Sequence, residues 1–278
     1  MSRTVSKVGR GGGWGTVAGR RLQRRRMRPT VLALEPRTLL SNLYVNSANS
    51  GTADGLTPAT GFTTIQAGIS IASTGDTILV ETGHGYNESD TVGVAGLTIE
   101  ADTGQHPVLD GTTPIAQASS GFTIIATGVT IAGFTIQNFS GPSAVLVQGG
   151  ASVTLSSDTI QENSASSSGG GIDNSGVLTV TQCTLTNNTA TIVGGGIFSG
   201  PGATLTITST TIASNSAISG GGVINFGTAN LTDSIVTSNT ADADGGGGGG
   251  LYNNGTTTLT NCTVSDNSAG EGAGLFNF

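Results

Sequence analysis

The chain has 278 residues, and its composition excludes a disordered protein, because its apolar residues (35%) are too many and too regularly spaced. Glycine accounts for 46 residues, while aromatic residues make up 4% and charged residues 10%. All ten basic residues lie at or before Arg37, and sixteen of the seventeen acidic residues follow it. The chain therefore divides into a basic leader and an acidic body without Lys or Arg.

Residues 1–41 form the basic leader, which we expect to be disordered. It includes the run GRRLQRRRMRP, and three interpretations compete: a nucleic-acid contact, a targeting segment or a disordered tail. The acidic body would repel phosphate, so we expect no nucleic-acid partner. Arg20 and Arg21 suggest a twin-arginine export signal, but no apolar run of sufficient length follows them. We also expect no transmembrane helix.

Residues 42–278 form the acidic body, which begins with a segment that we expect to cap a repeat structure. In residues 42–110, the stretch from Phe62 to Ser73 predicts a helix, because Ile65 and Ile69 lie on one face. A strand from Asp76 to Val80 follows it. We expect the helix to close the open end of the apolar interior, as terminal caps do in repeat proteins.

An asparagine returns about every 25 residues between residues 150 and 278, where the repeat is most regular. Each one follows aliphatic residues three and eight positions earlier and precedes a glycine cluster. The five residues are Asn163, Asn188, Asn215, Asn239 and Asn267. Each copy contains three short segments of strand character, too short for helices. The pattern predicts an all-β fold, a right-handed parallel β-helix of eight or nine coils with three strands per coil.

Equal spacing in the repeat also predicts columns of side chains along the solenoid. The five asparagines should form a ladder in which each side-chain amide bonds to the coils above and below. Cys183 and Cys262 share another column, three coils and about 14 Å apart, which is too far for a disulfide. We interpret both cysteines as small core residues.

The motif of the repeats, an aliphatic residue, then Asn-Ser/Thr-Ala and Gly-Gly-Gly, resembles the repeats of chlamydial-type polymorphic outer-membrane proteins. More broadly it is similar to the pectin-lyase-like β-helix superfamily, as is the capping segment. The resemblance covers roughly residues 150–278 and implies a secreted protein, or one at the cell surface or outer membrane, that commonly serves adhesion.

A second resemblance concerns the octet LEPRTLLS at the end of the leader. It is similar to a motif near the N-terminus of many planctomycete extracellular proteins and implies export and sorting. The matching residues are Leu34, Glu35, Pro36, Arg37, Leu39, Leu40 and Ser41.

Many β-helix relatives are enzymes acting on acidic polysaccharides, so catalysis is the alternative function. Pectate-lyase-like elimination needs a basic Arg or Lys, and the body offers neither. A glycoside hydrolase working with two carboxylates remains open. Its weak candidates are Asp158, Glu162 and Asp173, although Asp158 shares a column with Cys183 and so fits a polar corner residue. The aromatic residues of the body do not cluster with these acids in the sequence.

Asp242 and Asp244 precede six consecutive glycines and are similar in spacing to the start of a calcium loop. The third ligand and the later acid of such a loop are missing, so we assign no metal or cofactor and only leave room for calcium.

These observations predict a structural or adhesive protein that binds a polysaccharide or a surface protein through its lateral faces. The chain stops at GLFNF without a cap, so we expect truncation or self-association through the last coil. The alternative is a polysaccharide hydrolase that uses only carboxylates.

Overall fold

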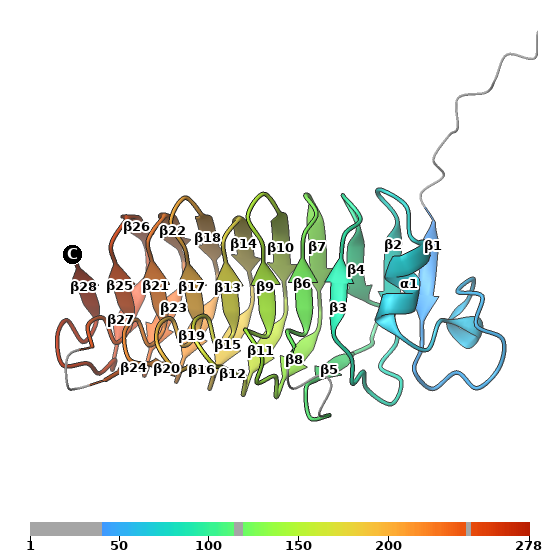
Figure 1. Cartoon of the computed structure of the whole chain (residues 1–278), viewed down its shortest axis with the longest axis horizontal. Helices are drawn as coiled ribbons and strands as arrows, with labels where there is room; N and C mark the ends of the chain where they lie inside the picture. Colours follow the sequence, from blue (N-terminus) through green and yellow to red (C-terminus); the bar gives the residue numbers. More distant parts are fainter. Residues whose placement is uncertain (1–40, 114–118, 243–245) are drawn as a thin grey trace, which may run out of the picture. The chain divides into compact units, whose positions relative to one another are not determined.

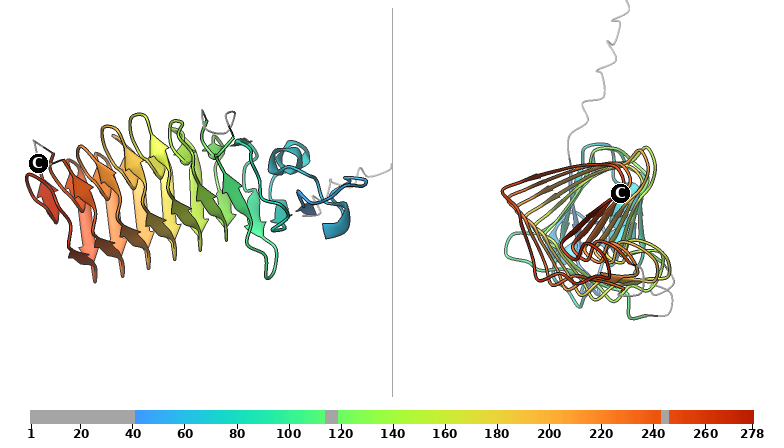
Figure 2. Two further views of the ribbon diagram at one scale, coloured as in Figure 1. Left: turned by 90° about the horizontal axis from the view of Figure 1, so that it is seen from below. Right: turned by 90° about the vertical axis from the view of Figure 1, so that its left-hand side faces the viewer.

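The computed structural model describes residues 41–113, 119–242 and 246–278, which belong to the unit Leu40–Phe278. Leu34 to Leu40 of the LEPRTLLS octet lie outside the described residues. The described unit is a parallel β-solenoid of about eight coils, as expected from the repeat (Figure 1). Seen along the solenoid axis, successive coils superpose and enclose the core (Figure 2).

Sheet A is the longest of the four parallel sheets that run along the solenoid. It contains nine strands in the order β1 (Asn42–Val45), β2 (Thr77–Val80), β4 (Thr98–Ala101), β7 (Val129–Ala132), β10 (Ser152–Ser156), β14 (Val177–Thr181), β18 (Thr204–Thr208), β22 (Thr228–Thr232) and β26 (Thr256–Thr260). The side chains alternate between the core and the outer face, as the alternating apolar residues predicted.

Sheets B and C form the other long walls of the solenoid. Sheet B contains β5 (Val108–Asp110), β8 (Thr135–Gln137), β11 (Thr159–Gln161), β15 (Thr184–Thr186), β19 (Thr211–Ala213), β23 (Ile235–Thr237) and β27 (Thr263–Ser265). Sheet C contains β3 (Asp90–Val92), β6 (Phe122–Ile124), β9 (Val145–Val147), β13 (Ile172–Asn174), β17 (Ile197–Ser199), β21 (Val223–Asn225), β25 (Leu251–Asn253) and β28 (Leu275–Asn277).

The expectation of three strands per coil was wrong for the regular repeats, which contain a fourth. Sheet D consists of two-residue strands, β12 (Ser164–Ala165), β16 (Thr189–Ala190), β20 (Ser216–Ala217) and β24 (Thr240–Ala241). Each strand directly follows a ladder asparagine. The alanines Ala165, Ala190 and Ala217 are buried and pack as a small separate cluster. This Ser/Thr-Ala pair therefore forms a short wall of its own.

Two corners of each regular coil are turned by a single residue with a positive φ angle. At the corner between sheets A and B these residues are Ser157, Gln182, Ser209, Asp233 and Asn261, and just before each ladder asparagine they are Glu162, Asn187, Ser214, Ser238 and Asp266. Non-glycine residues rarely adopt this conformation, which costs about 1–2 kcal/mol. The residue after most of these corners offsets this cost by hydrogen bonds to neighbouring coils, as Asp158 and Asn188 do.

The predicted capping helix is present but shorter than expected. Helix α1 spans Ile65–Ile71 and is preceded by a 3-10 turn, η1 (Pro58–Thr60). The side chain of Thr64 accepts from the N–H of Ala67 and starts the helix, and Ala72 is already extended. Ile65 and Ile69 are buried, and α1 packs against β1, β2 and β3. Among the described residues no helix is long and apolar enough to cross a membrane.

Beside α1, the core contains one carboxyl group in an aliphatic column. Asp90 of β3 pairs with Phe122 of β6, whose neighbour in the same column is Val145. Asp90 is completely buried, and neither carboxyl oxygen has a partner in hydrogen-bond geometry, although the carboxylate of Glu88 and the backbone of Gln66 lie nearby. Burial, followed by the neighbouring carboxylate of Glu88, raises the pKa of Asp90 well above its ordinary value.

Replacement of Asp90 by valine should stabilise the protein by about 1–3 kcal/mol, because it removes a buried polar group without a partner. The measurement is urea denaturation of the wild type and the variant. Thr91→Val, at the exposed neighbouring position, is the control and should change stability by less than about 0.5 kcal/mol. A loss of stability in Asp90→Val would show that the carboxyl group holds α1 in place.

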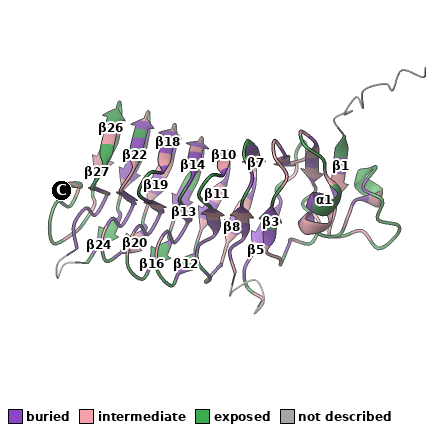
Figure 3. Cartoon of the chain, turned by 45° about the horizontal axis from the view of Figure 1, so that its top comes forward, coloured by how far each residue is buried: buried purple, intermediate pink, exposed green. Residues whose placement is uncertain are grey.

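At the other end of the described solenoid, the last coil leaves inward-facing apolar residues uncovered. Leu259 on β26 and Leu275 on β28 are 37% and 43% exposed, whereas their counterparts in earlier coils are buried (Figure 3). This agrees with the expected apolar edge at GLFNF.

Candidate functional site

The predicted asparagine ladder is confirmed. The Oδ1 atom of Asn215 accepts from the backbone N–H and the Nδ2 of Asn188, at 2.9 and 3.0 Å. Its own Nδ2 donates to the carbonyl oxygen of Leu185 and to Oδ1 of Asn239, both at 3.0 Å. The same pattern continues from Asn163 to Asn267. The ladder is buried over most of its length and serves the fold.

A second ladder in sheet C was missed in the sequence. Its column contains Asn174, Ser199, Asn225, Asn253 and Asn277. The Nδ2 of Asn225 donates to Oδ1 of Asn253 at 3.0 Å, and Asn253 donates to Asn277 at 2.7 Å. The sequence pattern that reveals this ladder is a polar residue two positions after the aliphatic residue that follows each glycine cluster.

Asp158 is a structural corner residue and not an accessible acid. It is 1% exposed, and its Oδ1 and Oδ2 accept from the N–H groups of Phe134 and Ser156 at 2.8 and 3.0 Å. Its backbone N–H in turn donates to the sulfur of Cys183 at 3.4 Å. Burial raises the pKa of Asp158 to about 8, although the two N–H donors partly oppose this.

The other two candidate acids lie on different sides of the same coil. Glu162 turns the corner between β11 and β12 with a φ of 57°, and Asp173 is the middle residue of β13 in sheet C. Burial raises the pKa of Asp173 to about 6. The structure therefore does not bring Asp158, Glu162 and Asp173 together as a catalytic pair.

The aromatic residues do not cluster with the acids in the sequence, but one of the acids lies beside a ring in three dimensions. Asp173 pairs in register with Phe198, and the same outward column continues through Ile224, Tyr252 and Phe276. The column follows directly after the aliphatic residue of each repeat, which is where the sequence could have revealed it.

The aromatic rings of this column contact each other along the solenoid axis. Tyr252 and Phe276 are stacked with centroids 5.0 Å apart, and Phe226 bridges Phe198 and Tyr252 at 5.9 and 6.4 Å. A sugar stacks on a free ring face, and the facing surfaces of Tyr252 and Phe276 are used by each other. The column therefore contributes to the stability of sheet C rather than forming an open platform.

The cysteines and the candidate calcium ligands give no metal centre in the described part of the chain. Cys183 and Cys262 are free thiols, and burial raises the pKa of Cys183 to about 12, as expected of a core residue. Asp244 lies outside the described residues, so the Asp242–Asp244 pair cannot be placed. No group of three His, Cys, Asp or Glu side chains suited to a metal occurs among the residues that are described.

The outer face of sheet A is the most extensive polar surface of the repeats. We call the outward residues of β10, β14, β18, β22 and β26 the threonine face: Ser152, Thr154, Ser156, Val177, Thr179, Thr181, Thr204, Thr206, Thr208, Thr228, Asn230, Thr232, Thr256, Thr258 and Thr260. They form three columns, spaced about 4.8 Å between strands and about 6.7 Å along each strand. Among the strand residues of sheet A, all of them described, Glu100 alone carries a charge.

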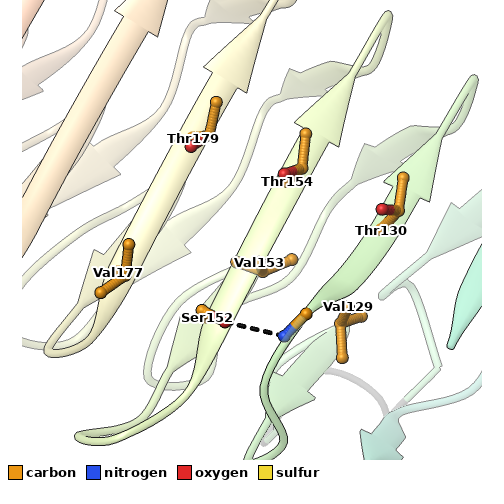
Figure 4. Close-up of a pocket in the computed structure, with 8 residues that line it drawn as sticks. Val129, Thr130, Ser152, Val153, Thr154, Val177 and Thr179 are labelled. Atoms are coloured by element: carbon orange, nitrogen blue, oxygen red, sulfur yellow. Dashed lines mark hydrogen bonds between the residues drawn. The ribbon is translucent and has the colours of Figure 1, made fainter. Parts of the chain in front are cut away.

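A shallow hollow of about 120 Å³ lies at the edge of the threonine face (Figure 4). Gly128 and Ser152 both line it, and the hydroxyl of Ser152 accepts from the N–H of Gly128 at 2.7 Å. Val177, which is 47% exposed, provides apolar surface, and Thr154 and Thr179 add hydroxyl groups. The volume is well below that of a pocket for a free small molecule.

Comparison with known proteins places this architecture in a family. A family model described as a right handed beta helix region matches residues 120–277. The chain belongs to the right-handed β-helix proteins. No protein with curated annotation matches this β-helix chain. A solved structure similar to it is the crystal structure of pectate lyase Pel9A, with a TM-score of 0.49 and 13% identity, covering 85% of this chain and 78% of the other.

The buried carboxyl groups of the β-helix predict an unusual dependence of stability on pH. The pKa values of Asp158 and Asp173 are raised to about 8 and about 6, so the folded state binds protons more tightly than the unfolded state. Their contribution is complete below about pH 4 and is lost as the pH rises through 6 and 8. The free energy of unfolding should fall between pH 5 and 9 by on the order of 5 kcal/mol, at about 1.4 kcal/mol for each pH unit over which a group loses its proton in the folded state.

Urea denaturation at pH 5, 7 and 9 measures this dependence. Asp158→Asn removes one titrating group and should flatten the profile between pH 7 and 9. A free energy of unfolding that rises steadily from pH 5 to 9 would contradict the assignment of raised pKa values.

Proposed function

We propose that this chain is an exported β-helix protein with a structural or adhesive role, secreted or held at the cell surface or outer membrane, which binds a glycan or a protein through its lateral faces. The observation that carries the proposal is the threonine face, a continuous, uncharged surface spanning five consecutive strands. Export is supported by the resemblance of LEPRTLLS to a planctomycete sorting motif, and adhesion by the resemblance of the repeats to polymorphic outer-membrane proteins. End-to-end association through the exposed residues of the last coil is a further part of this proposal.

The arrangement of the acids favours binding over catalysis. A glycosidase of the usual kind needs two carboxyl groups that flank one bond, within about 10 Å of each other. Asp158 is sealed in a corner, and Asp173 is the one acid among the outward strand residues of sheet C. No second carboxylate therefore accompanies Asp173 on the outward strand residues of sheet C.

The test is retention of the full chain on immobilised polysaccharides, neutral and acidic, with and without calcium. We expect saturable retention on at least one of them. Binding that requires calcium would restore the interpretation of Asp242 and Asp244 as ligands. Absence of retention on every polysaccharide would contradict the glycan part of the proposal and leave a protein as the ligand.

One observation supports the alternative of a polysaccharide hydrolase. The pKa of Asp173, about 6, is suitable for a general acid, and the residue lies beside the ring of Phe198. The check is release of reducing ends from the same polysaccharides. Activity that disappears in Asp173→Asn, but survives in Asp266→Asn at an exposed corner, would establish the alternative.

A further inference from the structure

The charge of the body indicates which class of ligand the threonine face can bind. Sixteen acidic residues and no basic residue follow Arg37, so the body repels a polyanion at any distance within the screening length. An acidic polysaccharide would also find no guanidinium or ammonium group to pair with its carboxylates. A neutral polysaccharide is not repelled by the acidic body and needs no cationic partner.

The chemistry of the face complements a sugar chain. The hydroxyl groups of Thr154, Thr179 and Thr206 make no hydrogen bond to other described groups of the protein, so they are available to a ligand as donors and acceptors. Each threonine also presents a methyl group, and Val177 is 47% exposed beside them. A neutral sugar has the same two kinds of surface, hydroxyl groups at its edges and C–H groups on its ring faces.

The first coils of sheet B offer a contrast, because their outward polar groups already bond to each other. Gln161 donates to Gln137 at 2.9 Å, and Gln137 donates to the carboxylate of Asp110 at 2.9 Å. In sheet C the outward column is occupied by Asp173 and by rings that stack on one another. The threonine face is therefore the wider uncharged surface, since its five-residue strands present three outward columns whereas the three-residue strands of sheet B present two.

We propose that one neutral polysaccharide chain lies along the threonine face, across β10 to β26, and contacts several coils at once. This inference rests on the proposed function and adds the class of ligand, the face and the mode of binding. The hollow beside Gly128 receives one ring at the edge of the face, and the equivalent columns of the following strands bind later sugar units. Each contact is weak, so the affinity comes from the number of coils that one chain reaches.

Multivalent binding predicts a steep dependence on chain length. The probes are soluble β-glucan, galactomannan and polygalacturonate, followed by the oligosaccharides of the neutral polymer that binds best, titrated by calorimetry against the full chain. In about 0.5 M salt, which screens the ten basic residues at or before Arg37, we expect no binding of polygalacturonate. The affinity for the neutral sugars should rise roughly 100-fold from disaccharide to hexasaccharide. Equal affinity for the disaccharide and the hexasaccharide, or tighter binding of polygalacturonate, would overturn the inference.

The variants locate the binding surface. Thr179→Arg combined with Thr206→Arg places two long side chains at the centre of the threonine face and should weaken hexasaccharide binding at least 10-fold. Thr179→Glu combined with Thr206→Glu should do the same, which excludes an effect of positive charge alone. The matched control is Thr184→Arg, an exposed residue of the same coil on sheet B, which should bind normally.

The possible outcomes distinguish failure of the threonine face as the site from failure of the proposed function. Normal binding by both double variants would overturn the threonine face as the site but leave glycan binding in place. Binding with release of reducing ends would contradict the non-catalytic role and leave the location of the site intact. Failure of all neutral polymers to bind would overturn the inference and leave a protein ligand for the lateral faces.

Discussion

Replacement of Asn215 by leucine should destabilise the protein by about 3–6 kcal/mol, the largest effect that we expect from a single side chain. The substitution leaves the backbone N–H of Asn188 and one of its two Nδ2 hydrogens without an acceptor, since Nδ2 keeps only its bond to Ile160. The carbonyl oxygen of Leu185 loses that donor. These groups are buried, so water cannot replace Asn215. Because Asn188 and Asn239 also bond to further asparagines, the loss should spread along the ladder.

Denaturation by urea, followed by circular dichroism, measures this effect. Asn230→Leu is the matched control, since Asn230 is exposed on the outer face of β22, and it should change the free energy of unfolding by less than about 0.5 kcal/mol. If Asn215→Leu and Asn230→Leu had equal stability, the ladder would contribute nothing to the fold.

Replacement of Gly221 by alanine should cost about 3 kcal/mol or more, because the coils pack too closely for a side chain at this position. A Cβ atom on Gly221 would lie 2.3 Å from the carbonyl oxygen of Thr240 and 2.7 Å from its backbone nitrogen. Both atoms belong to the backbone of the next coil, which cannot move without breaking the hydrogen bonds around it. The glycine clusters of the repeat are therefore required for the stacking of sheet D against the start of sheet C.

The control for this prediction is Gly149→Ala. The nearest atom to a Cβ at Gly149 is the carbonyl oxygen of Ser175 at 3.7 Å, which is an ordinary contact. We expect the thermal unfolding temperature of Gly221→Ala to fall by several degrees and that of Gly149→Ala to remain within a degree or two of the wild type. If Gly149→Ala lowered the unfolding temperature more than Gly221→Ala, close packing between coils would not be the reason for the repeat glycines.

The fold could be predicted because the repeat indicates both the length of one coil and which of its side chains face the core. A 25-residue period with aliphatic residues three and eight positions before an asparagine can stack only when each coil adds the same strands. The ladder from Asn163 to Asn267 follows from equal offsets alone. The helix near Ile65 could be predicted from its apolar stripe, but not its ends, because these depend on Thr64 and on the contact of Glu88 with the first turn.

Features that depend on the register between coils or on the direction of a side chain could not be predicted. The Ser/Thr-Ala pair after each ladder asparagine is too short to be recognised as a strand, yet it forms sheet D. The contact of Asp173 with Phe198 requires the register between β13 and β17, since the two residues are 25 positions apart. The burial of Asp158 depends on the direction of its side chain, toward the N–H of Phe134, which its position in a polar column does not reveal.

The most direct test of the account measures binding and turnover in the same sample. The full chain is incubated with the neutral polysaccharide that retains it, and the bound fraction and the released reducing ends are followed together. The account predicts saturable binding without product, and loss of binding when Thr179 and Thr206 are both replaced by arginine. Depolymerisation that Asp173→Asn abolishes, and that the arginine variant leaves unchanged, would contradict it.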